Sequence, residues 1–210
     1  MSDPLERLLQ HPSLWRASGQ AVAAPAVSTG FAQLDAHLPG GGWPCPALIE
    51  LLLEQCGLGE IDLLIPALRE LQAGWGPQAT PRALAWLNPP FIPYAPALAE
   101  RGLELRQQLI TGPLTPAQTL WAMEQALRSG ACAVVLAWAD KAGMQALRRL
   151  KLAAGEGGCL GVLFRSPRRR AQASPANVRV LLSRAAAQLQ IELLKVQRGR
   201  PAKLALRTFS

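Results

Sequence analysis

The stretch from Glu54 to Ile61, Glu-Gln-Cys-Gly-Leu-Gly-Glu-Ile, has the place and length of a phosphate-binding loop. It follows the apolar run 47–53, which predicts a buried strand. A working loop reads Gly-x-x-x-x-Gly-Lys-Ser/Thr, because main-chain amides and the lysine hold phosphates and the hydroxyl serves Mg²⁺. Aligned on Gly59, this chain has Glu54 at the first glycine, Glu60 at the lysine and Ile61 at the hydroxyl. A like charge at about 4 Å costs about 4 kcal/mol at an effective dielectric constant of 20, so we expect no nucleotide binding and no ATPase activity.

Other residues that could do chemistry are not grouped into a site. Asp140 follows the strand-like run 131–139, where an ATPase carries a magnesium ligand, but Asp140-Lys141 is more typical of a helix cap. His37 lies in a helical pattern beside no obvious partner. The four cysteines are far apart and form no Cys-x-x-Cys pair. We therefore expect no catalytic residue, no metal and no cofactor.

Positive charge is concentrated at the end of the chain. Residues 29–158 carry nine bases and eleven acids, whereas residues 159–210 carry eleven bases and the single acid Glu192. Such a distribution favours a polyanion or an acidic protein surface as partner, although a run of charges is often only a solvated face. The candidate contact residues are Arg165, Arg168, Arg169 and Arg170, in a proline-bounded loop, and Arg198, Arg200 and Lys203, around a Gly-Pro turn.

The elements that must position these residues alternate between strand-like and helix-like patterns. Strands are expected at 47–53, 82–87, 105–110, 132–138 and 159–164, and helices at 58–73, 96–101, 116–129 and 142–154. This alternation predicts an α/β domain with a mostly parallel sheet and helices on both faces. After residue 174 the strand-like runs 178–182, 189–196 and 204–207 have little helix between them, which predicts antiparallel C-terminal strands. Residues 1–27 are expected to be a short helix and linker, and residues 28–210 one domain with a basic part from about 159.

Residues 28–51, with Ser-Thr-Gly-Phe, Leu-Pro-Gly-Gly-Gly-Trp-Pro and Ala-Leu-Ile-Glu-Leu, resemble the entry to the RecA-type ATPase core. Four further stretches narrow the resemblance to the ImuA family. They are Trp86-Leu-Asn-Pro-Pro-Phe-Ile-Pro-Tyr, Trp121-Ala-Met-Glu-Gln-Ala-Leu-Arg-Ser-Gly, Arg148-Arg-Leu-Lys-Leu-Ala-Ala and Phe164-Arg-Ser-Pro. The resemblance covers about residues 28–210 and implies a RecA-like fold with a degenerate phosphate loop.

Membership of the ImuA family would imply an accessory role in SOS-induced translesion DNA synthesis and mutagenesis. The expected partners would be RecA, ImuB and an error-prone replicative-type polymerase, with weak DNA contact possible. The related SulA cell-division inhibitors are the alternative, and their partner would be the tubulin-like division protein. Because the two families share a fold in this interpretation, only the partner distinguishes them.

Two further features bear on location and binding. The sequence has no secretory signal and no apolar run long enough to span a membrane, so we expect a cytoplasmic protein, associated with the nucleoid after DNA damage. The proline-rich stretch 88–96 follows a predicted strand. It could be a docking surface or, equally, a rigid connector.

Overall fold

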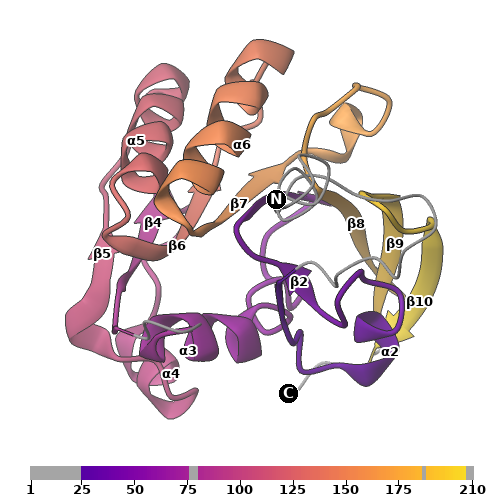
Figure 1. The fold of residues 1–210 in the computed structure, drawn as a ribbon, viewed down its shortest axis with the longest axis horizontal. Helices are drawn as coiled ribbons and strands as arrows, with labels where there is room; N and C mark the ends of the chain where they lie inside the picture. The colour runs from indigo at the N-terminus through magenta and orange to yellow at the C-terminus, as the bar shows by residue number, and fades with distance from the viewer. Residues whose placement is uncertain (1–24, 76–79, 186–187, 207–210) are drawn as a thin grey trace, which may run out of the picture.

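The computed structural model describes residues 25–75, 80–185 and 188–206, and an eight-stranded mixed sheet organises them (Figure 1). The strand order is β10-β9-β8-β3-β7-β6-β4-β5. The six strands from β8 to β5 are parallel, whereas β9 and β10 continue the sheet in antiparallel fashion. The bounds are β3 Ala47–Leu53, β4 Ala83–Leu87, β5 Gln108–Ile110, β6 Cys132–Trp138, β7 Leu160–Arg165, β8 Val178–Ala185, β9 Gln188–Val196 and β10 Ala202–Leu206. A small second sheet pairs β1 (Ala26–Val27) with β2 (Trp43–Pro44).

Strand composition follows the position of each strand in the sheet. All seven residues of β3 and all six of β7 are buried, as expected of parallel strands covered on both faces. In β9 buried and partly exposed residues alternate, because only one face of that strand lies against the core. The antiparallel part therefore has one covered and one largely open face.

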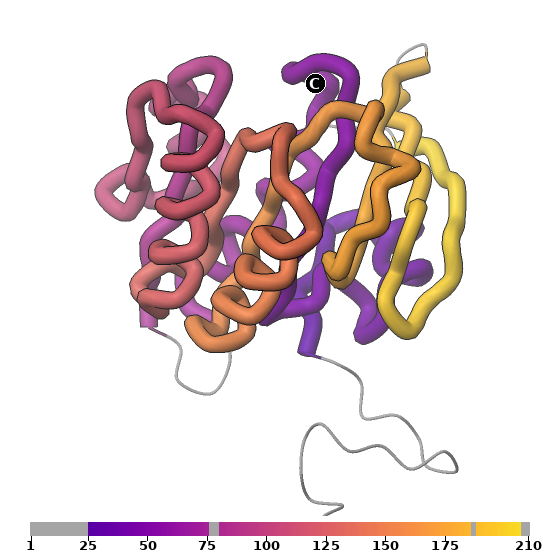
Figure 2. Tube along the Cα trace, turned by 90° about the horizontal axis from the view of Figure 1, so that it is seen from above, coloured from indigo at the N-terminus to yellow at the C-terminus, as the bar shows by residue number. Residues whose placement is uncertain are grey.

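Helices cover both faces of the parallel part. Figures 1 and 2 show α5 (Pro116–Arg128) and α6 (Met144–Gly157) side by side on one face, while α3 (Ile65–Ala73) and α4 (Ala95–Glu100) lie on the other. The short helix α2 (Ala32–Asp35) lies beside the antiparallel strands, and two 3₁₀ turns, η1 (Leu105–Gln107) and η2 (Pro167–Arg169), complete the elements. A capping box between Thr115 and Gln118 begins α5, and left-handed Gly158 ends α6.

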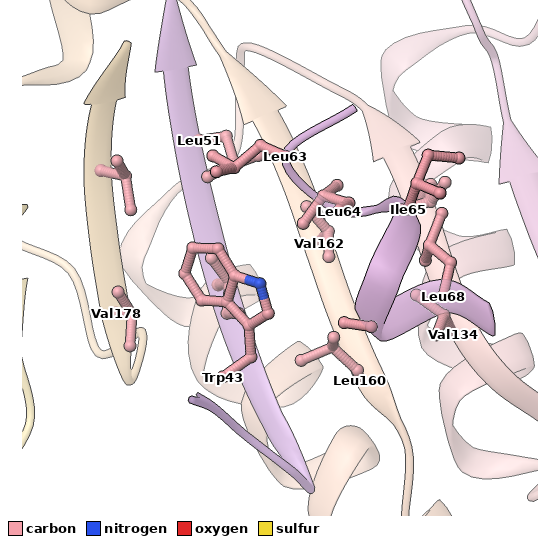
Figure 3. Close-up of a cluster of buried hydrophobic side chains, with 14 of the residues drawn as sticks. Trp43, Leu51, Leu63, Leu64, Ile65, Leu68, Val134, Leu160, Val162 and Val178 are labelled. Carbon is pink, nitrogen blue, oxygen red and sulfur yellow. The ribbon is translucent and has the colours of Figure 1, made fainter. Parts of the chain in front are cut away.

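The apolar core has two layers, one on each side of the sheet. The larger layer joins β3 and β7 to α3, and Figure 3 shows Trp43, Leu51 and Leu64 within it. The smaller layer lies under α5 and α6 and contains Leu48, Met123 and Leu147. No helix of the described residues is long and apolar enough to cross a membrane.

The predicted RecA-like fold with a degenerate phosphate loop was wrong about the segment after β3. In a phosphate-binding motif the strand leads through a glycine-rich loop into a helix, and the loop and the first turn of the helix hold the phosphates. Here residues 58–59 form a bend and residues 60–64 form turns, and α3 begins only at Ile65, with Pro66 in its first turn. The Glu60 carboxylate folds back onto the main-chain N–H of Gly57, at 2.9 and 3.1 Å, so the site of a phosphate is filled by the chain itself. The structure is a mixed α/β sheet without a phosphate-binding loop in its described residues.

Candidate partner-binding surface

Three stacked aromatic rings mark the carboxyl end of the parallel strands. Trp86, Trp138 and Phe164 come from the neighbouring strands β4, β6 and β7. The ring centroids of Trp138 and Phe164 lie 4.3 Å apart and those of Trp86 and Trp138 lie 6.3 Å apart, with nearly parallel planes. The indole N–H of Trp86 donates to Gln108 Oε1 at 2.7 Å, which fixes the ring against β5. The stack therefore gives this end of the sheet a rigid apolar floor.

The proline-rich loop, residues 88–96, follows β4 beside the stacked rings and is held by hydrogen bonds at its first residue, Asn88. Asn88 has a φ of 54°, in the left-handed region. Its side chain accepts from Leu114 N at 3.1 Å and donates to the carbonyl of Trp138 at 3.3 Å. Its own N–H donates to Thr111 Oγ1 at 2.9 Å. These three bonds connect the loop to β6 and to the segment between β5 and α5, so the loop leaves the sheet in a fixed direction.

Large apolar side chains on this loop face solvent. The exposed fractions are 76% for Phe91, 85% for Ile92 and 72% for Tyr94. Single exposed apolar residues are common on protein surfaces, but three within four positions form a patch. Prolines at 89, 90 and 93 restrict the main chain between them, so little conformational entropy would be lost when the patch is covered.

A pocket of about 300 Å³ opens between this loop and the turn after β3. Its lining includes the rings of Trp86 and Trp138, the apolar side chains of Ile61 and Leu98, and the ion pair of Arg101 with Asp62, at 2.9 Å. The carboxyl ends of parallel strands are the usual ligand-binding edge of such sheets. A mostly apolar lining, with one ion pair and the Glu60 carboxylate already bonded to Gly57, suits an apolar side chain of a partner better than an anionic metabolite.

Cys56 also lines the pocket, and its chemistry argues against nucleophilic catalysis. Burial, and to a smaller extent the charge of Glu60, raises the pKa of the Cys56 thiol. The thiol is therefore neutral at physiological pH and a weak nucleophile. No group of three or more His, Cys, Asp or Glu residues in the described part of the chain could hold a metal ion.

The residues that the sequence placed in a phosphate loop or at a magnesium position have other roles in the structure. Glu60 is buried and accepts from Gly57, as described above, and Ile61 packs against the main core. Glu54 is exposed at the end of β3. Asp140 does not cap α6, whose N-cap is Gly143. Instead, its carboxylate accepts from Ser166 N at 3.0 Å and pairs with Arg169 at 2.7 Å.

Arg165, predicted as a surface contact, lies in a buried cluster of charges. Its guanidinium is 2.7 Å from one oxygen of Glu50, and the guanidinium of Arg179 is 2.6 Å from the other. The side chains of Glu50 and Arg165 are fully buried. Arg165 also donates to the carbonyls of Asp140 and Ala142, so it connects β3 to the loop beyond β6 and is removed from any partner surface.

The other predicted cations lie at the surface but not in one group. Arg169 pairs with Asp140, and its hydrogen bond is the first cause that lowers the pKa of that carboxyl. Arg170 and Lys203 share Glu192, at 2.6 and 3.5 Å. The remaining three side chains are exposed and form no hydrogen bond or ion pair within the described ranges: Arg168, Arg198 and Arg200. Sequence alone did not reveal the pairing because the partners are distant along the chain.

Comparison with known proteins matches the part of the chain that builds the pocket. The family model described as cell division inhibitor SulA matches residues 52–161, slightly more than half of the chain. Cell division inhibitor SulA of Citrobacter koseri is 35% identical over 104 residues, which are 49% of this chain and 58% of that protein. The crystal structure of SulA from Pseudomonas aeruginosa matches with 26% identity and a TM-score of 0.45, over 56% of this chain and 97% of that one.

The family model and the Citrobacter koseri relative correct the family assigned from sequence. The ImuA resemblance was wrong, and the role in translesion synthesis and the partners RecA, ImuB and polymerase lose their support, as does the weak DNA contact. Three of the four stretches used for that resemblance begin at Trp86, Trp121 and Arg148, inside the matched range. The candidate basic contact residues, from Arg165 to Lys203, lie outside it. The chain belongs to the SulA family of cell division inhibitors.

Proposed function

We propose that this chain inhibits cell division by binding the tubulin-like division protein and reducing the amount that can polymerise. The inhibitor acts by occupancy and without catalysis, so inhibition rises with the molar ratio of inhibitor to target. Arrest of division while damaged DNA is repaired fits such a protein, and it would act in the cytoplasm, where the division protein assembles.

The observation that carries the proposal is the exposed apolar surface of Phe91, Ile92 and Tyr94 beside the pocket. Every residue that lines this pocket lies within residues 56–138, inside the range matched by the family model. The exposed cations Arg198 and Arg200 lie outside that range. A function common to the family is therefore better supported at the pocket than at the basic turn.

The geometry fits a protein–protein interface in which large apolar side chains at the centre occupy pockets on the partner. Aromatic and large aliphatic side chains in pockets provide most of the binding energy of typical interfaces, surrounded by polar residues that exclude water. Here Phe91 and Ile92 can enter a depression on the partner, while a partner side chain fills the pocket above Trp86 and Trp138. The Arg101–Asp62 ion pair gives this surface a polar rim.

The test is GTP-dependent polymerisation of the purified division protein, measured by sedimentation and light scattering. Increasing wild-type inhibitor should remove polymer in proportion to its concentration. Phe91→Ala combined with Ile92→Ala should need at least about tenfold more protein for the same effect, since hot-spot truncations cost about 2 kcal/mol or more.

Two variants control this experiment. Leu152→Ala removes a side chain that is 63% exposed on α6, away from the pocket, and should inhibit like wild type. Arg198→Ala combined with Arg200→Ala tests the basic turn and should also leave inhibition unchanged. Normal polymerisation at a molar excess of wild-type protein would refute the proposed function. Equal potency of the pocket variant and wild type would refute the assigned surface.

A further inference from the structure

The strand β10 ends the sheet with an open edge. It pairs with β9 alone, through five antiparallel positions from Ala202↔Leu193 to Leu206↔Leu189. On its other side no strand of the described residues pairs with it, so alternate residues direct their N–H and C=O groups outward. β10 contains no proline and no bulge, which are two of the features that commonly blunt such an edge, and it carries a third, the charged side chain of Lys203. Its outer side can accept another strand.

Side chains beside this edge divide into an apolar and a charged face. Ala202, Leu204 and Leu206 pack against the main core, whereas Lys203 and Ala205 are exposed on the opposite face. A shallow groove of about 430 Å³ adjoins the end of β10, lined by Phe31, Ala32, Gln33, Gln188, Ala205 and Leu206. A strand added to β10 could therefore place an apolar side chain in the groove beside α2. On its opposite face, the added strand would lie near cations.

Charge around the edge is positive and only partly neutralised. Arg170 and Lys203 share the single carboxylate of Glu192. Arg198 and Arg200, in the turn that leads into β10, are exposed and form no ion pair within the described ranges. A second copy of this chain would bring the same cations to the edge, and like charges directly opposite one another destabilise strand pairing. The edge is complementary to a strand with carboxylates.

We propose that β10 binds an extended acidic segment of a partner protein by strand addition. Main-chain hydrogen bonds to the outer side of β10 provide affinity, and alternation of side chains provides specificity. Apolar residues of the segment lie toward Leu204 and the groove beside α2, and its carboxylates lie toward Lys203, Arg200 and Arg198. This surface lies outside residues 52–161, so it is separate from the pocket and its test does not depend on division inhibition.

The probe is a fluorescein-labelled ten-residue peptide of alternating Glu and Val, with binding followed by fluorescence anisotropy of the full chain. Two further peptides carry N-methyl groups on either all Glu amides or all Val amides. Alternate residues of a strand face opposite sides, so one methylated peptide should bind at least tenfold more weakly and the other should stay within threefold of the parent. Equal effects of the two methylation patterns would overturn strand addition.

Charge and location are tested separately. Lys203→Glu should weaken the parent peptide at least tenfold, while Arg148→Glu, the same charge change at an exposed position on α6, should change affinity less than threefold. Amide hydrogen exchange should slow at alternate residues of β10 when the peptide is bound. Unchanged exchange in β10, equal effects of the two charge variants, or binding of duplex DNA or of a second copy in place of the peptide would each overturn the proposal.

Discussion

Replacing Glu50 by Gln tests whether the buried charges hold the sheet to its loops. The substitution keeps the shape of the side chain but removes the carboxylate that contacts both Arg165 and Arg179. One amide oxygen can still accept a hydrogen bond, whereas the new NH₂ group faces a guanidinium donor. Losing one charge-assisted bond costs about 1.5–3 kcal/mol, and two buried cations are left without a counter-charge. We expect a loss of about 3–5 kcal/mol in the free energy of unfolding, the range for a broken buried ion pair.

Urea denaturation followed by circular dichroism measures this loss, provided that the slope of the transition is unchanged. Glu192→Gln is the matched control, because Glu192 also contacts two cations but is partly exposed and should cost at most about 1 kcal/mol. In the Glu50→Gln protein, Arg165 keeps its hydrogen bonds to the backbone carbonyls of Asp140 and Ala142, so this variant should still fold. Equal losses in the two variants would refute the assigned role of the buried cluster.

Three further predictions concern packing, thiol chemistry and pH. Gly157→Ala should cost about 1–3 kcal/mol, because a Cβ there would lie 1.8 Å from a main-chain oxygen of α5, whereas Gly155→Ala on the same helix meets nothing within 4 Å and should stabilise by about 0.5–1 kcal/mol in thermal unfolding. Because burial raises the pKa of Cys56, its alkylation should accelerate about tenfold per pH unit from pH 7 to pH 9, and bound division protein should slow it; a rate without pH dependence would contradict this. The hydrogen bond from Arg169 is the largest cause that lowers the pKa of Asp140, so the contribution of this carboxylate to stability is complete above about pH 4 and is lost as the pH falls through the lower folded-state pKa. The stability of Asp140→Asn should therefore approach that of wild type in acid. A difference in unfolding free energy that stays constant with pH would contradict the pairing.

Most strands could be predicted from local sequence because burial on both faces leaves a continuous apolar run. The run 47–53 forms β3 with the same bounds, and the run 132–138 forms β6. The C-terminal runs form β8, β9 and β10, but only β9 and β10 extend the sheet in antiparallel fashion, because β8 runs parallel to β3. The helix expected at 58–73 is shorter, since Pro66 and the Glu60 turn delay its start to Ile65. The spacing of Gly57 and Gly59 in the sequence could not show this later start, because glycine spacing does not fix the residue at which a helix begins.

The functional surface was only partly visible in the sequence. The proline-rich stretch was identified as a possible docking surface, but the exposure of Phe91 and the pocket beside it depend on the turn after β3 and on α4. The sequence could not show which cations of the basic quarter are paired, because Arg165 has its counter-charge at Glu50, 115 residues away. Distant pairings of this kind arise from the sheet order, in which β3 lies between β7 and β8.

The dissociation constant of the complex between this chain and the tubulin-like division protein tests the central claim most directly. It should be measured by titration calorimetry for wild type, for Phe91→Ala combined with Ile92→Ala, and for Leu152→Ala. A loss of about 2 kcal/mol at the pocket surface corresponds to about 30-fold weaker binding, with Leu152→Ala equal to wild type. No binding heat for wild type, or the same dissociation constant for the pocket variant and wild type, would contradict the account.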